Sequence, residues 1–83
     1  MSVMTLATDR FLLITAASAQ WHDRDWLLAH LAPGLSVTDV TPDWSCQILT
    51  GAASRAILGP LTDADLSLPW LSHQAARVAG RPA

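Results

Sequence analysis

Three histidines and two closely spaced aspartates are the first candidates for chemistry in this 83-residue chain. His22 and His30 lie eight positions apart with no cysteine near them, and His73 is remote, so these residues lack the spacing of a zinc site. Asp63 and Asp65, in Leu-Thr-Asp-Ala-Asp-Leu-Ser, lack the further oxygen ligands and the closing glutamate of a calcium loop. We therefore expect no metal centre, surface histidines and an aspartate-capped turn.

The possible nucleophiles are equally isolated. Ser45 and Ser54 are not part of a Gly-x-Ser-x-Gly elbow. Cys46 lies on the apolar side of an expected strand, which predicts a buried and inert thiol. Asp23 and Asp25 fall in the first turns of an expected helix, where the helix dipole favours carboxylates without any catalytic role. The residues alone thus contain no complete catalytic constellation.

Composition narrows the class of protein. The chain is 51% apolar and 14% charged, has a net charge of −2, and its five basic residues are scattered arginines, which argues against a nucleic-acid partner. No apolar run approaches the roughly 18 residues that span a bilayer, so we expect no membrane partner. The lone cysteine fits a reducing cytoplasm, where we expect the protein to be located.

The length predicts one domain over residues 1–83. The apolar surplus predicts a protein partner, or self-association through exposed apolar surface.

Two strands are expected at the start of the chain. Residues 3–7 alternate, residues 8–10 have turn chemistry, and the apolar run 11–15 predicts a buried second strand. The run also resembles the apolar part of a signal peptide that ends in Ala-Ser-Ala. Because the charges of Asp9 and Arg10 cancel, no positively charged segment precedes the run, and the strand interpretation is favoured.

A helix is expected over residues 19–31, with Ser18 as its N-cap and Pro33-Gly34 as its stop. An apolar stripe on one side of this helix predicts packing on a sheet; its members are Trp21, Leu27, Leu28 and Leu31. Trp26 falls on the opposite side, as either an incidental surface residue or a second contact surface.

The second half alternates over residues 35–40 and 44–48, which predicts a hairpin with Trp44, Cys46 and Ile48 on one face. A short helix is expected over residues 53–58, and its buried edge would consist of Ala53, Ala56 and Ile57. Residues 72–79 favour a helix by propensity alone.

The segment from Gly51 to Ser67 resembles the folate-binding family of aminomethyltransferases, which includes the glycine-cleavage T-protein and the C-terminal parts of dimethylglycine and sarcosine dehydrogenases. The matching residues are Arg55, Leu58, Leu61, Thr62, Asp63, Asp65, Leu66 and Ser67. Asp-Arg-Phe-Leu-Leu-Ile-Thr at residues 9–15 and Leu-Pro-Trp-Leu-Ser-His-Gln at residues 68–74 look most like the dehydrogenase branch.

The resemblance implies an α+β fold of antiparallel strands and two short helices, forming part of a folate-binding domain. It also implies a strand, not a helix, over residues 75–79. Two departures from the family are evident. Ala52 stands where the family usually has a proline, and Thr15 and Ser18 follow a strand after which T-proteins carry asparagines, so the amide that contacts the pterin is absent.

In the family, a catalytic aspartate precedes the strand that matches residues 2–6, and a folate-contacting Gly-Tyr-x-Gly-Glu-like segment follows the position of Ala83. The resemblance thus implies an internal fragment of a tetrahydrofolate-dependent one-carbon transfer domain, inactive alone, with no catalytic residue of its own. Its partner would be the remainder of the folate domain or another subunit. By position, Leu13 would pack against the cofactor and Thr15 would offer a polar contact, although both could equally fill and finish a strand. The alternative is a free-standing noncatalytic subunit or interaction module on the same scaffold.

Overall fold

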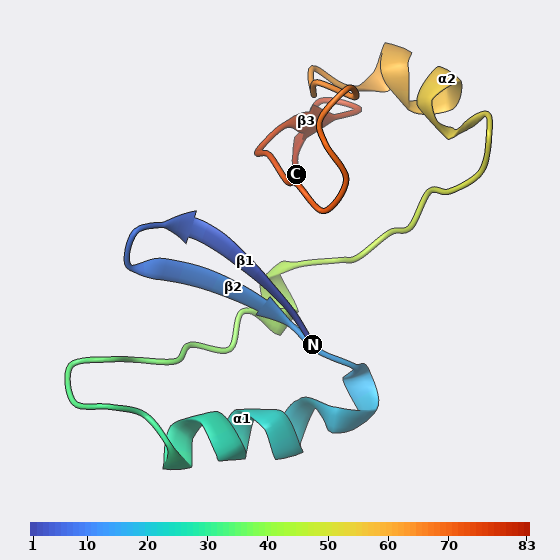
Figure 1. The fold of residues 1–83 in the computed structure, drawn as a ribbon. Helices are drawn as coiled ribbons and strands as arrows, with labels where there is room; N and C mark the ends of the chain where they lie inside the picture. The colour runs from blue at the N-terminus through green and yellow to red at the C-terminus, as the bar shows by residue number, and fades with distance from the viewer. The chain divides into compact units, whose positions relative to one another are not determined.

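The computed structural model describes residues 1–83, which divide into two compact units, Met1–Ser45 and Cys46–Ala83. In the first unit, strands β1 (Ser2–Ala7) and β2 (Arg10–Ile14) precede helix α1 (Gln20–Ala29) (Figure 1). The second unit contains helix α2 (Ser54–Leu58) and strands β3 (Arg77–Val78) and β4 (Arg81–Pro82). Three short 3₁₀ turns complete the regular structure: Ala17–Ala19, Thr41–Asp43 and Gly59–Leu61. The α+β class, with antiparallel strands and two short helices, is confirmed.

Strands β1 and β2 form an antiparallel ribbon close to where the alternating pattern predicts it. The pairing runs from Ser2 opposite Ile14 to Ala7 opposite Arg10, and a bulge at Leu6 separates the last two pairs. Met4 and Leu12 face each other and are half-buried, whereas Leu13 is 39% exposed. The prediction that the second strand is well buried is wrong, because a ribbon of two strands leaves both of its faces without a covering layer.

Helix α1 is shorter than expected and is not capped by Ser18. The 3₁₀ turn Ala17–Ala19 occupies the place of the cap, so the helix begins at Gln20 without a side-chain cap. It ends at Ala29, where the amide of His30 donates to the carbonyls of Trp26 and Leu27. The stripe on α1 is not buried against a sheet, since Trp21 is 67% exposed and extensive packing joins only neighbouring elements such as β1 and β2.

No hairpin forms over residues 35–48. The carboxylate of Asp39 instead accepts a hydrogen bond of 2.9 Å from the amide of Thr41, which initiates the 3₁₀ turn Thr41–Asp43. The flanking residues remain extended without a ladder of hydrogen bonds, and Cys46 is exposed. The predictions of a hairpin and of a buried thiol are therefore wrong, because alternation describes a face that a second layer must cover.

The second unit confirms the short helix and decides the structure of the tail. Helix α2 follows Gly51, which has a φ of 115°, but its expected apolar edge is exposed, with Ile57 57% accessible. Strands β3 and β4 are joined by Ala79 and Gly80, so the tail is a hairpin, and its helix propensity is overruled. Thr62 forms an isolated antiparallel bridge to Val78 on β3.

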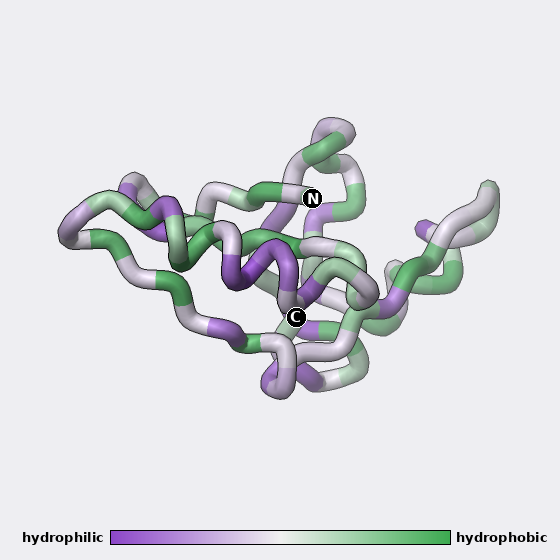
Figure 2. Tube along the Cα trace, turned by 90° about the horizontal axis from the view of Figure 1, so that it is seen from below, coloured by the Kyte–Doolittle hydropathy of each residue, from purple (hydrophilic) through white to green (hydrophobic).

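Neither unit has a hydrophobic core. No side chain of the chain is buried, although apolar residues recur along the whole trace (Figure 2). No helix has the length and apolar character needed to cross a membrane. An isolated two-stranded ribbon and a ten-residue helix are both marginal in water.

Candidate functional site

The end of β2 is joined to the first turn of α1 by one side-chain hydrogen bond. The hydroxyl of Thr15, the residue after β2, donates to Oδ2 of Asp23 across the intervening turn. Both residues are half-buried, unlike most of the chain. Thr15 therefore occupies a defined position, with its hydroxyl proton engaged and its oxygen able to accept one further hydrogen bond.

Both carboxylate oxygens of Asp23 have side-chain partners. Besides the bond from Thr15, its Oδ1 lies 3.1 Å from Nδ1 of His22, whose side chain is 81% exposed. The hydroxyl of Thr15, and then the imidazole of His22, lower the pKa of Asp23 because both stabilise the ionised carboxylate. Both contacts thus favour the ionised form of Asp23 at the start of α1.

Leu13 lies one residue inside β2, opposite Val3 of β1. Strand alternation places it on the same face as Phe11, which is 53% exposed. The structure therefore presents Leu13 as part of an open apolar ribbon face. Leu13 lies in β2 and Thr15 directly follows its end, two residues later. No interaction joins the two side chains.

The other candidate side chains do not converge. His22 and His30 are exposed at opposite ends of α1, where the ring of His30 stacks on Trp26 with centroids 4.1 Å apart. Nδ1 of His30 also lies 2.8 Å from the carbonyl oxygen of Trp26. No group of three metal-ligating side chains is present. These contacts give His30 a structural explanation as the end of the helix.

The Thr-Asp-Ala-Asp-Leu-Ser block has a structural role that the sequence shows only in part. As expected for a capped turn, Oδ1 of Asp65 accepts from the amide of Ser67 at 2.9 Å and from its hydroxyl at 2.6 Å. Hydrogen bonds from the hydroxyl and then the amide of Ser67 lower the pKa of Asp65. This carboxylate is therefore committed to the turn and shows no metal-ligand geometry.

Thr62 and Asp63 bind the backbone of strand β3 from 15 and 14 residues away, respectively. The hydroxyl of Thr62 donates to the carbonyl of Arg77 at 2.7 Å, and the amide of Arg77 donates to Oδ1 of Asp63 at 2.7 Å. These two bonds explain why a segment with helix propensity is extended. Sequence reasoning missed them, because nothing local marks Arg77 as their partner.

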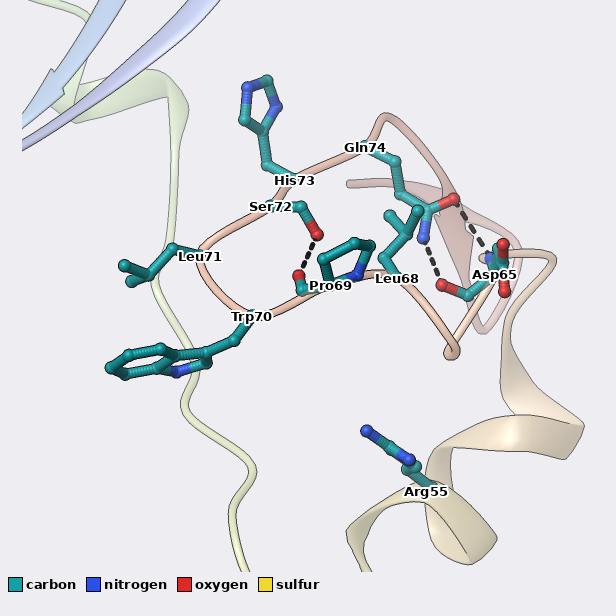
Figure 3. A pocket seen from close by; sticks show the side chains of 9 residues that line it. All are labelled: Arg55, Asp65, Leu68, Pro69, Trp70, Leu71, Ser72, His73 and Gln74. Atoms are coloured by element: carbon teal, nitrogen blue, oxygen red, sulfur yellow. Dashed lines mark hydrogen bonds between the residues drawn. The ribbon is translucent and has the colours of Figure 1, made fainter.

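Gln74 is another residue that sequence reasoning missed. Its side chain makes two hydrogen bonds with the backbone of Asp65: the amide of Asp65 donates to Oε1 at 3.0 Å, and Nε2 donates to the carbonyl at 2.7 Å. This pair closes the base of the loop of residues 68–74, which we call the Trp70 loop (Figure 3). The only sequence signal was the resemblance of residues 68–74 to the dehydrogenase branch.

The Trp70 loop and Arg55 of α2 line an open hollow of about 420 Å³ (Figure 3). The hydroxyl of Ser72 donates to the carbonyl of Pro69 inside the loop, and Trp70 is 90% exposed. The guanidinium of Arg55 has no ion pair or hydrogen bond. The hollow thus combines apolar surface with an unpaired positive charge.

Comparison with known proteins identifies the family to which this chain belongs. The profile of the GCVT N-terminal domain matches residues 1–83. Two curated relatives, each named aminomethyltransferase, come from Synechococcus elongatus (strain PCC 7942) and Synechococcus sp. (strain PCC 6301). Each is 38% identical over 74 residues, which cover 88% of this chain and 20% of the relative. The chain thus spans about a fifth of the length of these relatives, and no solved structure matches it.

Proposed function

Because the chain belongs to the GCVT N-terminal domain family, we propose that it forms part of a tetrahydrofolate-binding domain that transfers one-carbon groups, and that it is not catalytic alone. The observation that carries this proposal is the match of the family model over residues 1–83. The 38% identity to two aminomethyltransferases supports it further. In this proposal, the partner of the chain is the remainder of the folate domain or a second subunit. The protein would act in the cytoplasm.

The finer assignment is to a protein like dimethylglycine or sarcosine dehydrogenase. It is supported by the segments at residues 9–15 and 68–74, which resemble that branch, and by Thr15, where T-proteins carry an asparagine.

Sequencing the coding region on both sides tests the assignment to a folate domain. An upstream strand with an aspartate and a downstream Gly-Glu segment, both in frame, are the expected result.

The residues that we assign to the cofactor are Leu13 and Thr15, and both fit a wall of such a site. When bound, tetrahydrofolate would supply the nitrogen that takes up the one-carbon unit. Leu13 offers exposed apolar surface. Because the proton of the Thr15 hydroxyl is donated to Asp23, Thr15 can only accept a hydrogen bond from the ligand, which suits an N–H group.

A transplant tests both the function and the assigned wall. In the Synechococcus elongatus relative, the matching 74 residues are replaced by this chain, and aminomethyl transfer is measured with tetrahydrofolate binding. In an active chimera, Thr15→Val should weaken binding about threefold to tenfold, the equivalent of one hydrogen bond. Thr38→Val, at an exposed position, is the matched control. Equal affinity in both variants would remove Thr15 from the site.

A titration of the isolated chain with tetrahydrofolate tests the claim that it is incomplete. The fluorescence of its four tryptophans reports binding, and we expect no saturable change. Saturation at micromolar tetrahydrofolate would show that the 83 residues hold a whole site.

A second candidate function is a noncatalytic interaction module on the same scaffold. The observation that favours it is the absence of any buried side chain in either unit, which leaves large apolar residues such as Ile48 and Trp70 available to a partner. Start and stop signals directly flanking the segment would support this candidate over the first.

A further inference from the structure

The Trp70 loop holds two large apolar side chains out in water. Trp70 is 90% exposed and Leu71 is 84% exposed. The hydrogen bonds of Gln74 to Asp65 brace the base of the loop, and the bond from Ser72 to Pro69 braces its tip. Leu71 has a φ of 61°, a conformation that bulky residues rarely adopt unless the surrounding structure imposes it. The apolar tip is therefore displayed by a braced loop and does not result from fraying.

The positively charged side chain of Arg55 lies beside the Trp70 loop. Arg55 projects from α2 into the hollow beside the loop (Figure 3), and its guanidinium has no partner in the chain. The nearby Asp65 accepts from Ser67 through Oδ1 and forms no ion pair with Arg55. The surface therefore suits a partner that offers apolar contacts next to a carboxylate.

The first unit contains a surface with that chemistry. A hollow of about 250 Å³ is lined by Met1, His22, Asp23, Trp26 and Leu27, and we call it the Trp26 hollow. Its apolar walls are the side chains of Met1, Trp26 and Leu27, and Trp26 is 54% exposed. Its carboxylate, Asp23, accepts from Thr15 through Oδ2 and lies beside the imidazole of His22 through Oδ1, and each oxygen can accept a further hydrogen bond.

The charges of the two stretches of sequence also have opposite sign. Residues 1–45 contain five aspartates and two arginines, whereas residues 46–83 contain three arginines and two aspartates. Their formal charges are therefore −3 and +1. Complementary charges steer association and select its orientation.

From these observations we propose that the chain associates head to tail with a second copy of itself, the Trp70 loop of one copy docking into the Trp26 hollow of the next. The tip of the loop contacts Trp26 and Leu27, and Arg55 lies against Asp23. The contact is heterologous, so it leaves one loop and one hollow free for further copies. This inference does not depend on folate binding or on one-carbon transfer.

The expected association is weak. A tryptophan buries about 150–250 Å² when fully covered, so one loop in one hollow remains well below the roughly 1,200 Å² of a stable interface. The complex should therefore depend on concentration and weaken as salt screens the pairing of Arg55 with Asp23.

Sedimentation velocity over a concentration series tests the proposal on the wild-type chain and three variants. Trp70→Ala and Arg55→Glu should weaken association at least threefold, whereas Trp44→Ala, at an exposed position outside both surfaces, should leave it unchanged. Far-UV circular dichroism verifies that each variant retains the secondary structure of the wild type.

A mixing experiment separates the loop from the hollow. Trp70→Ala retains an intact hollow and Trp26→Ala an intact loop, so each should be monomeric alone while the mixture forms one-to-one pairs. Pairing in the mixture also shows that both variants are folded.

A wild type that stays monomeric at every concentration would overturn the proposal and leave the Trp70 loop to the rest of a longer polypeptide. Equal weakening by Trp44→Ala, or a mixture that fails to pair, would overturn it as well.

Discussion

The turn between β3 and β4 provides the sharpest test of the second unit. Its two central residues, Ala79 and Gly80, have φ values of 49° and 79°. Positive φ at both positions is the requirement of a type I′ turn, which prefers Asn-Gly over Ala-Gly. We predict that Ala79→Asn stabilises the hairpin, because asparagine enters the left-handed region more readily than alanine does.

The expected change in the free energy of hairpin closure follows from backbone conformational preferences alone. A several-fold preference of asparagine for this region corresponds to about 1 kcal/mol, or roughly a fivefold shift toward the closed hairpin. Gly80→Ala should do the reverse, by about 1–2 kcal/mol. No atom lies within 4 Å of a Cβ built at Gly80, so a steric clash does not contribute to this loss.

Hydrogen exchange of two amides measures the effect. The amides of Ala76 and Ala83 donate to each other's carbonyls, at 2.9 Å and 2.7 Å, and are protected only while the hairpin is closed. Their exchange should slow about fivefold in Ala79→Asn and accelerate in Gly80→Ala. Unchanged protection in both variants would refute the argument from turn conformation.

Three further predictions concern single side chains. Gln74→Ala should release the amide of Asp65 and accelerate its exchange severalfold, whereas Gln47→Ala, at an exposed position, should not; equal effects would contradict the brace. Thr15→Val should raise the pKa of Asp23, measured by NMR of its carboxyl carbon. Because the folded pKa lies below the ordinary value of 3.8, the contribution of Asp23 to stability is present above that pH and is lost as the pH falls through the folded pKa; an unchanged titration would exclude the bond from Thr15. Ser18→Ala should leave the helicity of α1 unchanged by circular dichroism, whereas an N-cap role predicts a loss worth about 1 kcal/mol.

Local patterns located the first ribbon and α2 well. Alternation over residues 3–7 and the turn chemistry of residues 8–10 predicted β1 and β2 with small errors at their ends. Gly51 and the Gly59-Pro60 pair correctly indicated where α2 begins and ends. Both signals depend on neighbouring residues, which the sequence shows directly.

The tail and the candidate site depended on partners distant in sequence. Residues 72–79 favour a helix locally, but Thr62 and Asp63 bind the backbone of Arg77 and select a strand. The family resemblance anticipated that strand, although propensity did not. The resemblance also named Thr15, while its bond to Asp23 emerged only from the structure, and its contact with the cofactor remains a prediction.

The sequence by itself indicated the α+β class and the family through its resemblance to known proteins, and residue type and spacing indicated the bounds of the first ribbon and of α2. The tertiary structure decided which of those faces are covered, and it left Leu13, Cys46 and Ile57 exposed. Burial depends on a second layer contacting each face. An apolar pattern specifies the face but cannot supply that layer.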